Sequence, residues 1–271
     1  MEILRLRAFT IGDDPASGNP AGVVLDAESL DEAGMLAIAA ELGYSETAFL
    51  TAITPDAATI RYFSPRAEIG FCGHATIASA VALARRGAAP VVRLATPVGE
   101  VPVEATAERA TLIAVDERVA ALAEPLLDEL LAALRLDHAD LDPELAPAFV
   151  TGANPHPVVF VLPGVLDRLD HDADAVLALQ DREGWDGTVP VVHRLAPTAF
   201  VSRNPFPRGG IREDPATGSA AAGLGSVLRA RSDLAVPATI TIDQGAETGH
   251  PSRLIVDIPT EGRIRVTGTA G

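Results

Sequence analysis

The sequence contains no lysine, so all 21 of its basic residues are arginines. A Schiff base to a carbonyl substrate or to pyridoxal phosphate needs a lysine amine, and a P-loop needs a lysine for its phosphates. Neither kind of site is available to this chain. The formal net charge is −16 and no basic run is present, so we expect no binding to nucleic acid or to an anionic membrane. Any anionic ligand must be held by local groups.

Cysteine, long apolar runs and metal-ligand motifs are also scarce. Cys72 is the only cysteine, which rules out an intramolecular disulfide and is typical of a reducing compartment. No apolar run reaches about 18 residues, and residues 1–10 show no export signal, so we predict a cytoplasmic protein without a membrane span. No metal site and no cofactor are predicted, because histidine pairs at ligand spacing and nucleotide-binding glycine motifs are missing.

The apolar pattern predicts an α/β chain of mixed topology. Residues 30–42 have helical spacing, with Ser29 as the expected N-cap and Gly43 at the stop. Residues 74–86 are apolar on nearly every side, which is typical of a buried helix. Further helices are predicted at 122–136 and 219–229, and strands at 3–10, 21–25, 47–51, 58–63, 91–103 with a turn at 97–99, and 110–115.

The two halves of the chain look like a diverged repeat. Thr47-Ala48-Phe49-Leu50 recurs as Thr198-Ala199-Phe200-Val201. Each copy is followed by an acidic residue, a glycine-bearing loop and an Ala-rich helix. The loops are Cys72-Gly73-His74-Ala75-Thr76 and Glu213-Asp214-Pro215-Ala216-Thr217-Gly218-Ser219. The alternative is that both loops are chance Gly/Ala-rich turns.

The two loops point to anion binding. The first turn of a buried helix presents unpaired N–H groups and the positive end of its dipole. Gly73 and Gly218 allow a ligand to approach this backbone closely. If both helix starts face one cleft, they can hold a carboxylate and stabilise the enolate-like charge that develops when a proton leaves the adjacent carbon.

Three titratable side chains beside the loops are candidates for the proton transfer. Glu46 precedes an apolar strand, where partial burial raises a carboxyl pKa, although a solvated turn carboxylate is the commoner role. His74 is either a proton shuttle or a structural histidine. Asp214 either orients His74 or caps the following helix, and Thr217 and Ser219 either bond a carboxylate or act as caps. Cys72 is a candidate thiolate, but without a second cysteine a small buried hydrophobe is the better interpretation.

Five segments resemble, in order, the motifs of the PhzF-like family of phenazine-biosynthesis proteins. They are Gly18-Asn19-Pro20-Ala21-Gly22-Val23-Val24, Ser45-Glu46-Thr47-Ala48-Phe49, Cys72-Gly73-His74-Ala75-Thr76, Glu213-Asp214-Pro215-Ala216-Thr217-Gly218-Ser219-Ala220, and Gln244-Gly245 with Pro251-Ser252. Together they span nearly the whole chain. One departure is His250, which stands where the family commonly has arginine and which bears on any anion contact made there.

The resemblance implies the diaminopimelate-epimerase fold, with two pseudo-symmetric domains, each a curved mixed sheet around a central buried helix. The expected halves are 1–118, completed by the last residues of the chain, and 119–271, with the active site in the cleft between them. The resemblance also implies a homodimer and a cofactor-independent isomerase. In such an enzyme Glu46 moves a proton on a small cyclic carboxylate, assisted by His74 and Asp214. The implied substrate-binding residues are Asn19, Gly73, Ala75, Thr217, Gly218 and Ser219.

Two other functions remain open from the residues. One is a racemase, epimerase or dehydratase of an amino or hydroxy acid that uses Cys72. The other is a catalytically silent binding protein that retains the fold, since fold does not fix function.

Overall fold

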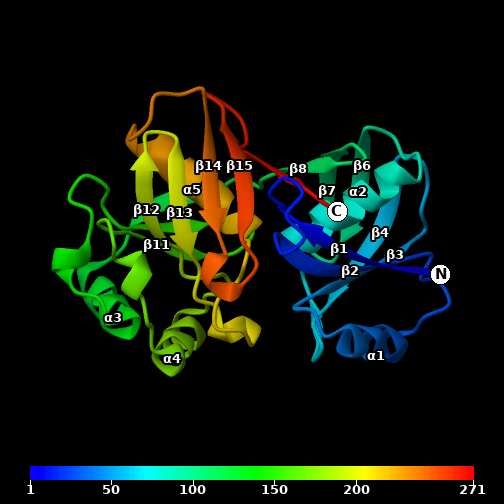
Figure 1. Ribbon diagram of the computed structural model, residues 1–271, viewed down its shortest axis with the longest axis horizontal. Helices are drawn as coiled ribbons and strands as arrows, with labels where there is room; N and C mark the ends of the chain where they lie inside the picture. The colour runs from blue at the N-terminus through cyan, green and yellow to red at the C-terminus, as the bar shows by residue number, and fades with distance from the viewer. The chain divides into compact units, whose positions relative to one another are not determined.

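A computed structural model describes all 271 residues. The chain divides into two compact units. The first unit contains residues 1–113 and 267–271, and the second contains residues 114–266. In Figure 1 the first unit carries the blue and cyan elements, and the second carries most of the green to orange ones. None of the helices combines the length and apolar character needed to cross a membrane.

The first unit is a mixed sheet around a buried helix. Its strand order is β1-β2-β3-β4-β6-β7-β8, with β5 paired to β4. The pairs β2–β3 and β4–β6 are parallel. Helix α2 packs against β1, β2, β3, β7 and β8, while α1 packs against β3 and β4. The bounds are β1 Glu2–Ala8, β2 Asn19–Leu25, α1 Glu32–Leu42, β3 Thr47–Thr51, β4 Ala57–Phe63, β5 Glu68–Ile69, α2 Gly73–Arg85, β6 Val91–Thr96, β7 Gly99–Ala105 and β8 Arg109–Ile113.

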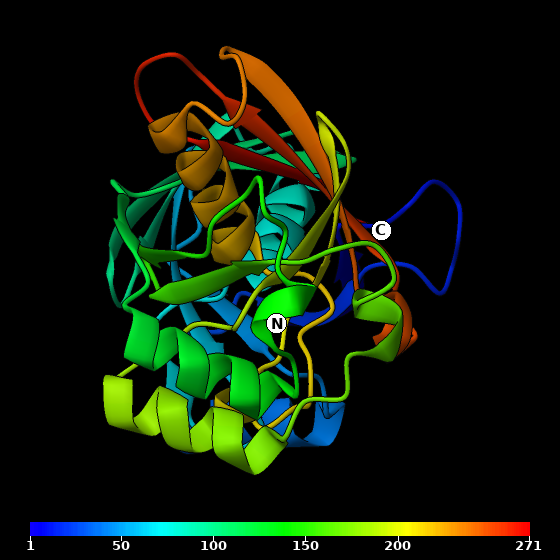
Figure 2. The same ribbon diagram turned by 90° about the vertical axis from the view of Figure 1, so that its left-hand side faces the viewer.

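The second unit repeats this plan and adds to it. Its strand order is β15-β14-β13-β12-β11-β10-β9, and the pairs β11–β12 and β13–β14 are parallel. Helix α5 packs against β9, β10, β11 and β15. Helices α3 and α4 pack against each other beside the sheet (Figure 2). The bounds are β9 Arg118–Ala121, α3 Glu124–Leu134, β10 Ala148–Thr151, β11 His156–Phe160, α4 Ala173–Glu183, β12 Val191–Ala196, β13 Ala199–Arg203, α5 Gly218–Arg231, β14 Ala238–Gln244 and β15 Ser252–Ile258. Strand β16, Arg265–Thr269, begins in the second unit and ends in the first.

Strand pairing fixes the register of the internal repeat. Asn19-Pro20 are the first two residues of β2, and Asn154-Pro155 immediately precede β11; aligning these pairs makes Val24 equivalent to Val159. Val24 pairs with Phe49 in β3, and Val159 pairs with Val191 in β12. The predicted match of the segment at 47–50 with that at 198–201 is therefore wrong. Residues 199–203 form β13, whose partners make it the counterpart of β4 and not of β3.

Equivalent strands also pair in the same register across the next ladder. Phe49 lies opposite Arg61, and Val191 lies opposite Arg203. Phe63 lies opposite Glu68, and Pro205 bridges to Glu213. By this register Cys72, Gly73 and His74 correspond to Thr217, Gly218 and Ser219. The two loops singled out in the sequence are thus true counterparts, each opening the buried helix of its unit.

The outer helices show how local signals set element ends. Helix α1 has Asp31 as its N-cap, with its carboxylate accepting from the Gly34 N–H at 2.8 Å, so the expectation of Ser29 is wrong. An aspartate at this position satisfies one of the unpaired first-turn donors. Helix α4, which the sequence pattern did not reveal, is built in the same way: Asp172 is its N-cap, and it ends at Gly184 in the left-handed conformation, as α1 does at Gly43.

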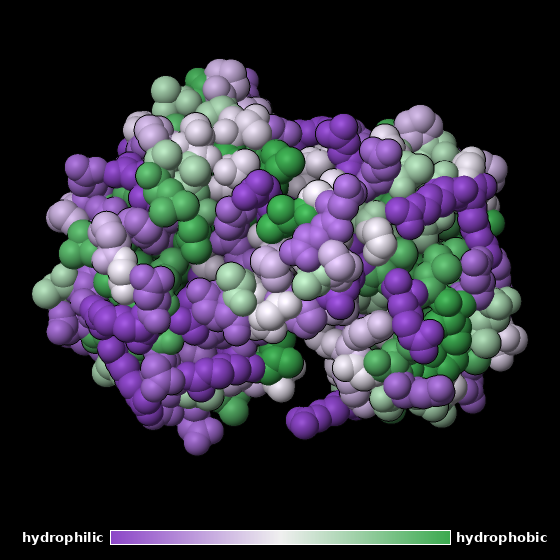
Figure 3. Space-filling model, in the orientation of Figure 1, coloured by the Kyte–Doolittle hydropathy of each residue, from purple (hydrophilic) through white to green (hydrophobic).

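The central helices are buried almost all round, as the apolar pattern predicted. Residues 74–83 of α2 are all buried, and α5 buries ten of its residues. In the second unit a separate apolar cluster joins α3, α4 and the strands beside them. The surface in view mixes hydrophilic and hydrophobic residues on both units (Figure 3).

Candidate active site

In the first unit three chemically active side chains meet at the start of α2. The Glu46 Oε2 atom lies 3.4 Å from Nε2 of His74, and the Cys72 Sγ atom lies 3.3 Å from Nδ1 of the same ring. Glu46 lies just before β3, whereas Cys72 and His74 lie at the N-cap and second residue of α2. Pairing of β2 with β3 and packing of α2 against both strands bring these segments together.

The contacts of His74 decide which ring nitrogen carries the proton. The Asn19 Nδ2 group lies 3.2 Å from His74 Nδ1, and an amide nitrogen can only donate. Nδ1 is therefore the acceptor, and in the neutral ring the proton is on Nε2. That proton faces the Glu46 carboxylate. Asn19, expected as a substrate ligand, makes a contact that orients His74.

The environment of Glu46 favours the protonated acid more than water does. Its side chain is only 13 % exposed. Burial raises the pKa of Glu46 above its usual value, while hydrogen bonds from Ser45 and Cys72 oppose this rise. A carboxyl group with a raised pKa is better able to both accept and return a proton than one in water.

A chain of buried hydroxyls anchors the loop that carries Cys72. The Thr76 Oγ1 group donates to the Cys72 carbonyl at 2.6 Å. Tyr62, fully buried on β4, therefore donates its hydroxyl to Thr76 Oγ1 at 2.6 Å. Burial raises the pKa of Tyr62, so this phenol stays protonated. This chain of hydrogen bonds fixes the start of α2 relative to β4.

In the second unit Asp214 belongs to a closed hydrogen-bond ring. Thr217 donates its hydroxyl to Asp214 Oδ2 at 2.6 Å. Gln244 donates to the Asp214 carbonyl at 2.6 Å and accepts from the Thr217 N–H at 3.3 Å. Thr217 occupies the N-cap position of α5 but makes no side-chain cap bond. Its hydroxyl instead orients the Asp214 carboxylate.

Ser219 is joined to His156, a buried histidine for which the sequence motifs predicted no role. Its Oγ atom lies 2.9 Å from His156 Nε2 and accepts from Asn154 Nδ2 at 3.4 Å. The other ring nitrogen, Nδ1, lies 2.9 Å from the Thr188 carbonyl. The Thr188 hydroxyl in turn accepts from Asn204.

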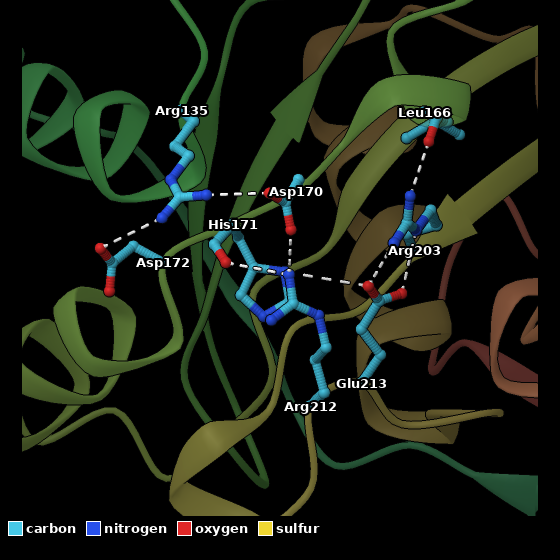
Figure 4. Close-up of polar contacts among 8 residues, drawn as sticks. All are labelled: Arg135, Leu166, Asp170, His171, Asp172, Arg203, Arg212 and Glu213. Atoms are coloured by element: carbon cyan, nitrogen blue, oxygen red, sulfur yellow. Dashed lines mark hydrogen bonds and ion pairs between the residues drawn. The ribbon is translucent and has the colours of Figure 1, made fainter.

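A buried ion pair supports the loop that precedes Asp214. Arg203 binds Glu213 through two nitrogens and also donates to the Leu166 carbonyl at 2.7 Å (Figure 4). Beside this pair lies His171, whose Nδ1 atom is 3.8 Å from the Glu213 carboxylate. Burial and the nearby Arg212 guanidinium lower the pKa of His171, so this ring is neutral. The ion pair holds Glu213 in place, and it therefore also restrains the adjacent residue, Asp214.

The remaining predicted residues are placed as follows. Gly73 and Gly218 are the first residues of α2 and α5. Ala75 is fully buried, and its methyl side chain offers no polar group to a ligand. The N–H of His250 donates to the Gly245 carbonyl at 3.1 Å. Sequence reasoning missed Asn154 and His156; the recurring Asn-Pro pair, at 19–20 and 154–155, is the signal that could have located them.

Two groups of side chains have the donor types that hold metals. Glu46, Cys72 and His74 bring their ligand atoms within 4.8 Å of one another, as do the exposed residues Glu124, Asp128 and His138. The first group combines carboxylate, thiolate and imidazole, all of which Zn²⁺ accepts. These are the same three groups that contact one another at the start of α2.

Comparison with known proteins defines the class of this enzyme. A crystal structure of the Bacillus anthracis phenazine biosynthesis protein, PhzF family, matches with a TM-score of 0.84 at 24 % identity, covering 100 % of this chain and 97 % of that one. A probable proline racemase from Agrobacterium radiobacter K84 matches in fold at TM-score 0.65 and 18 % identity, with 99 % and 90 % covered. The curated relative "Uncharacterized isomerase YddE" of Escherichia coli (strain K12) is 32 % identical over 240 residues, 84 % of this chain and 78 % of the relative. The chain is an isomerase on the diaminopimelate-epimerase-like fold, as the motifs predicted.

The family follows from the whole length of the sequence. The sequence model described as "Phenazine biosynthesis-like protein" matches residues 6–271. The chain belongs to this family.

Proposed function

We propose that this isomerase shifts a proton on a small, cyclic carboxylated metabolite without a cofactor, and that Glu46 carries the proton. The observation that supports this most directly is the buried Glu46 carboxyl 3.4 Å from the imidazole of His74. As base, Glu46 takes the proton from the carbon next to the substrate carboxylate. As acid, it returns the proton elsewhere on the same ring. The reaction is balanced because one proton leaves and re-enters the substrate.

His74 has a separate role in this proposal. Its Nε2–H group donates toward the Glu46 carboxylate and stabilises the charged form that acts as base. The Asn19 side chain keeps the ring in the tautomer that allows this. When Glu46 has taken up the substrate proton, the same contact favours its release.

The anionic part of the substrate is assigned to the helix starts. The first-turn N–H groups of α2 and α5 are proposed as ligands for the carboxylate, since they carry the positive ends of two buried helix dipoles. Asp214, held by Thr217, is proposed to assist the proton shift. By this proposal both units serve one reaction, and loss of either Glu46 or Asp214 impairs it.

Replacement of Glu46 by Gln tests the proposal. Glu46→Gln keeps the size and polarity of the side chain but cannot accept a proton, so we expect turnover and exchange of substrate hydrogen in deuterated water to fall by at least about 100-fold. Folding and ligand affinity should change little. Glu100→Gln, an exposed carboxylate on β7, is the matched control and should keep full activity. A fully active Glu46→Gln enzyme refutes the assignment.

The pH dependence of the rate gives a second test. Because burial raises the pKa of Glu46, the acidic limb of kcat/KM should lie above pH 4.5, with activity lost as the pH falls through it. Cys72→Ala removes a hydrogen bond that lowers this pKa, so the limb should move to higher pH.

A racemase or epimerase that uses Cys72 is the second candidate function. It is favoured by the contact of Cys72 Sγ with His74 Nδ1 at 3.3 Å, at the positive end of α2. In that reaction Cys72→Ala abolishes α-proton exchange with amino or hydroxy acids. In the Glu46 reaction the same variant keeps most of its rate. The counterpart of Cys72 in the second unit is Thr217, so a symmetrical pair of thiols is not formed.

We also propose that the protein is a homodimer. This proposal rests on family resemblance alone, and sedimentation at several protein concentrations tests it. A monomer at micromolar concentration contradicts it.

A further inference from the structure

The second unit contains a hydrogen-bond chain whose direction is fixed at both ends. His156 is 1 % exposed and lies at the first residue of β11. Its Nδ1 atom lies 2.9 Å from the Thr188 carbonyl oxygen, which can only accept. Nδ1 must therefore carry a proton. The Thr188 hydroxyl lies 3.3 Å from the same nitrogen and accepts from Asn204 at 3.2 Å, and its second lone pair can also accept from Nδ1–H.

The other ring nitrogen then acts as an acceptor. Burial lowers the pKa of His156 to about 4, so the ring is neutral at pH 7 and Nε2 has no proton. The partner of Nε2 is the Ser219 hydroxyl at 2.9 Å. Ser219 must therefore spend its single proton on His156, while Asn154 donates to the same oxygen at 3.4 Å. What Ser219 has left for a ligand is a lone pair.

The surroundings of the ring are shaped to hold it in this orientation. Gly187 lies against it: an added Cβ would be 2.6 Å from the His156 Cε1 atom and 2.4 Å from the Pro155 carbonyl. The Gly187 carbonyl accepts from the buried amide of Gln180 at 2.7 Å, which fixes this backbone. In the first unit the residue equivalent to His156 is Ala21, and the residue equivalent to Ser219 is His74. The serine–histidine pair therefore belongs to the second unit alone.

We propose that His156 is a positioning residue that turns the Ser219 proton inward, so that Ser219 accepts a hydrogen bond from a hydroxyl or amino group of the substrate. This rests on the proposed function in one respect, namely that the substrate is bound at the start of α5. The substrate class is then narrower than a cyclic carboxylate. It carries a hydrogen-bond donor besides its acid group, and the backbone N–H groups of α5, not the Ser219 hydroxyl, are left to bind the carboxylate.

The first measurement needs no ligand. Nitrogen-15 NMR of histidine-labelled enzyme at pH 7, assigned with His156→Phe, reports which nitrogen of His156 is protonated. We expect the neutral Nδ1–H form. A ring protonated on Nε2, alone or together with Nδ1, overturns the proposal whatever ligands do, because Nε2 then donates to Ser219 and frees its proton.

The second measurement compares two probes of similar size, 3-hydroxybenzoate and 3-fluorobenzoate, of which only the first can donate. We expect the full-length enzyme to bind the hydroxy acid about 10-fold more tightly, which is the contribution to affinity of about one hydrogen bond. Ser219→Ala should bring the affinity ratio close to one. His156→Phe should lower the ratio too, because it releases the serine proton. Ser226→Ala, on the same helix but bonded to Glu117, is the control and should keep the wild-type ratio.

In the affinity measurement two outcomes contradict the proposal: equal affinity for both acids in the wild-type enzyme, or a preference that survives Ser219→Ala. The tautomer result decides it even where neither acid binds measurably. Failure of the proposed function is distinguishable from these outcomes. In Glu46→Gln the proposed function predicts lost proton exchange, whereas the His156 tautomer and the affinity ratio should both be unchanged.

Discussion

The internal repeat supplies a matched pair of ion pairs that differ in burial and in the further partner of the arginine, Glu32 for Arg61 and the Leu166 carbonyl for Arg203. The difference in burial predicts how unequally they contribute to stability. Arg203 and Glu213 have side chains that are 9 % and 6 % exposed. Their counterparts in the first unit, Arg61 and Glu68, are 32 % and 30 % exposed. The strand register is the same in both units, so the two arginines occupy equivalent backbone positions.

Replacing Arg203 by Met leaves the Glu213 carboxylate buried without its counter-charge and the Leu166 carbonyl without its donor. Breaking one side of a buried pair costs about 3–5 kcal/mol. The exposed pair is screened by water, and Arg61→Met should cost about 1 kcal/mol or less. The double variant Arg203→Met with Glu213→Leu removes both charges and should recover most of the loss.

The assay can be made specific to each unit. Trp185 is the only tryptophan, is 2 % exposed and lies in the second unit, so its fluorescence in a urea titration reports the unfolding of that unit. Circular dichroism reports both units together. We expect Arg203→Met to shift the Trp185 transition strongly and Arg61→Met to leave it nearly unchanged. Equal losses from the two single variants, or a loss below about 1 kcal/mol for Arg203→Met, would refute the burial argument.

Three further predictions follow from single sites. Burial raises the pKa of Glu117 to about 7, against the hydrogen bond from Ser226. At pH values between the usual and the raised pKa, the folded state holds a proton that the unfolded chain has released. The free energy of unfolding should therefore fall as the pH rises from about 4.5 to 7, by at most about 3 kcal/mol. Glu117→Gln should remove this pH dependence, which denaturation curves at pH 5 and 8 would measure. Gly187→Ala should destabilise the second unit by about 1–3 kcal/mol through overpacking against His156. The control is Gly223→Ala, whose added Cβ meets nothing closer than 3.4 Å and which should be neutral or stabilising. A Gly187→Ala protein as stable as the wild type would contradict the close contact between Gly187 and His156. Prolonged EDTA dialysis should leave the isomerase rate unchanged, and added Zn²⁺ should inhibit by occupying Glu46, Cys72 and His74; activity lost to EDTA and restored by Zn²⁺ contradicts cofactor independence.

Features that depend on neighbouring residues were accessible from the sequence. The buried helices at 73–85 and 218–231 were predicted because apolar residues on all sides leave no face for water. The glycine-bearing loops before them, the family and the isomerase class followed from four motifs of five to eight contiguous residues and one pair of dipeptides. Even here the cap of α1 was misplaced by two residues, since Ser29 and Asp31 are both good caps and only packing selects between them.

The tertiary structure alone decided the register of the repeat and the partners of distant side chains. The sequence similarity between residues 47–50 and 198–201 gave the wrong alignment of the two units, because strands are equivalent when their pairing partners are, whatever their residue identities. His156 appeared to be an isolated histidine because its partners, Thr188 and Ser219, lie 32 and 63 residues away. The direction of each hydrogen bond depends on the whole network of donors and acceptors around it. Folding assembles that network from segments far apart in the sequence, and nothing in the sequence indicates that they will meet.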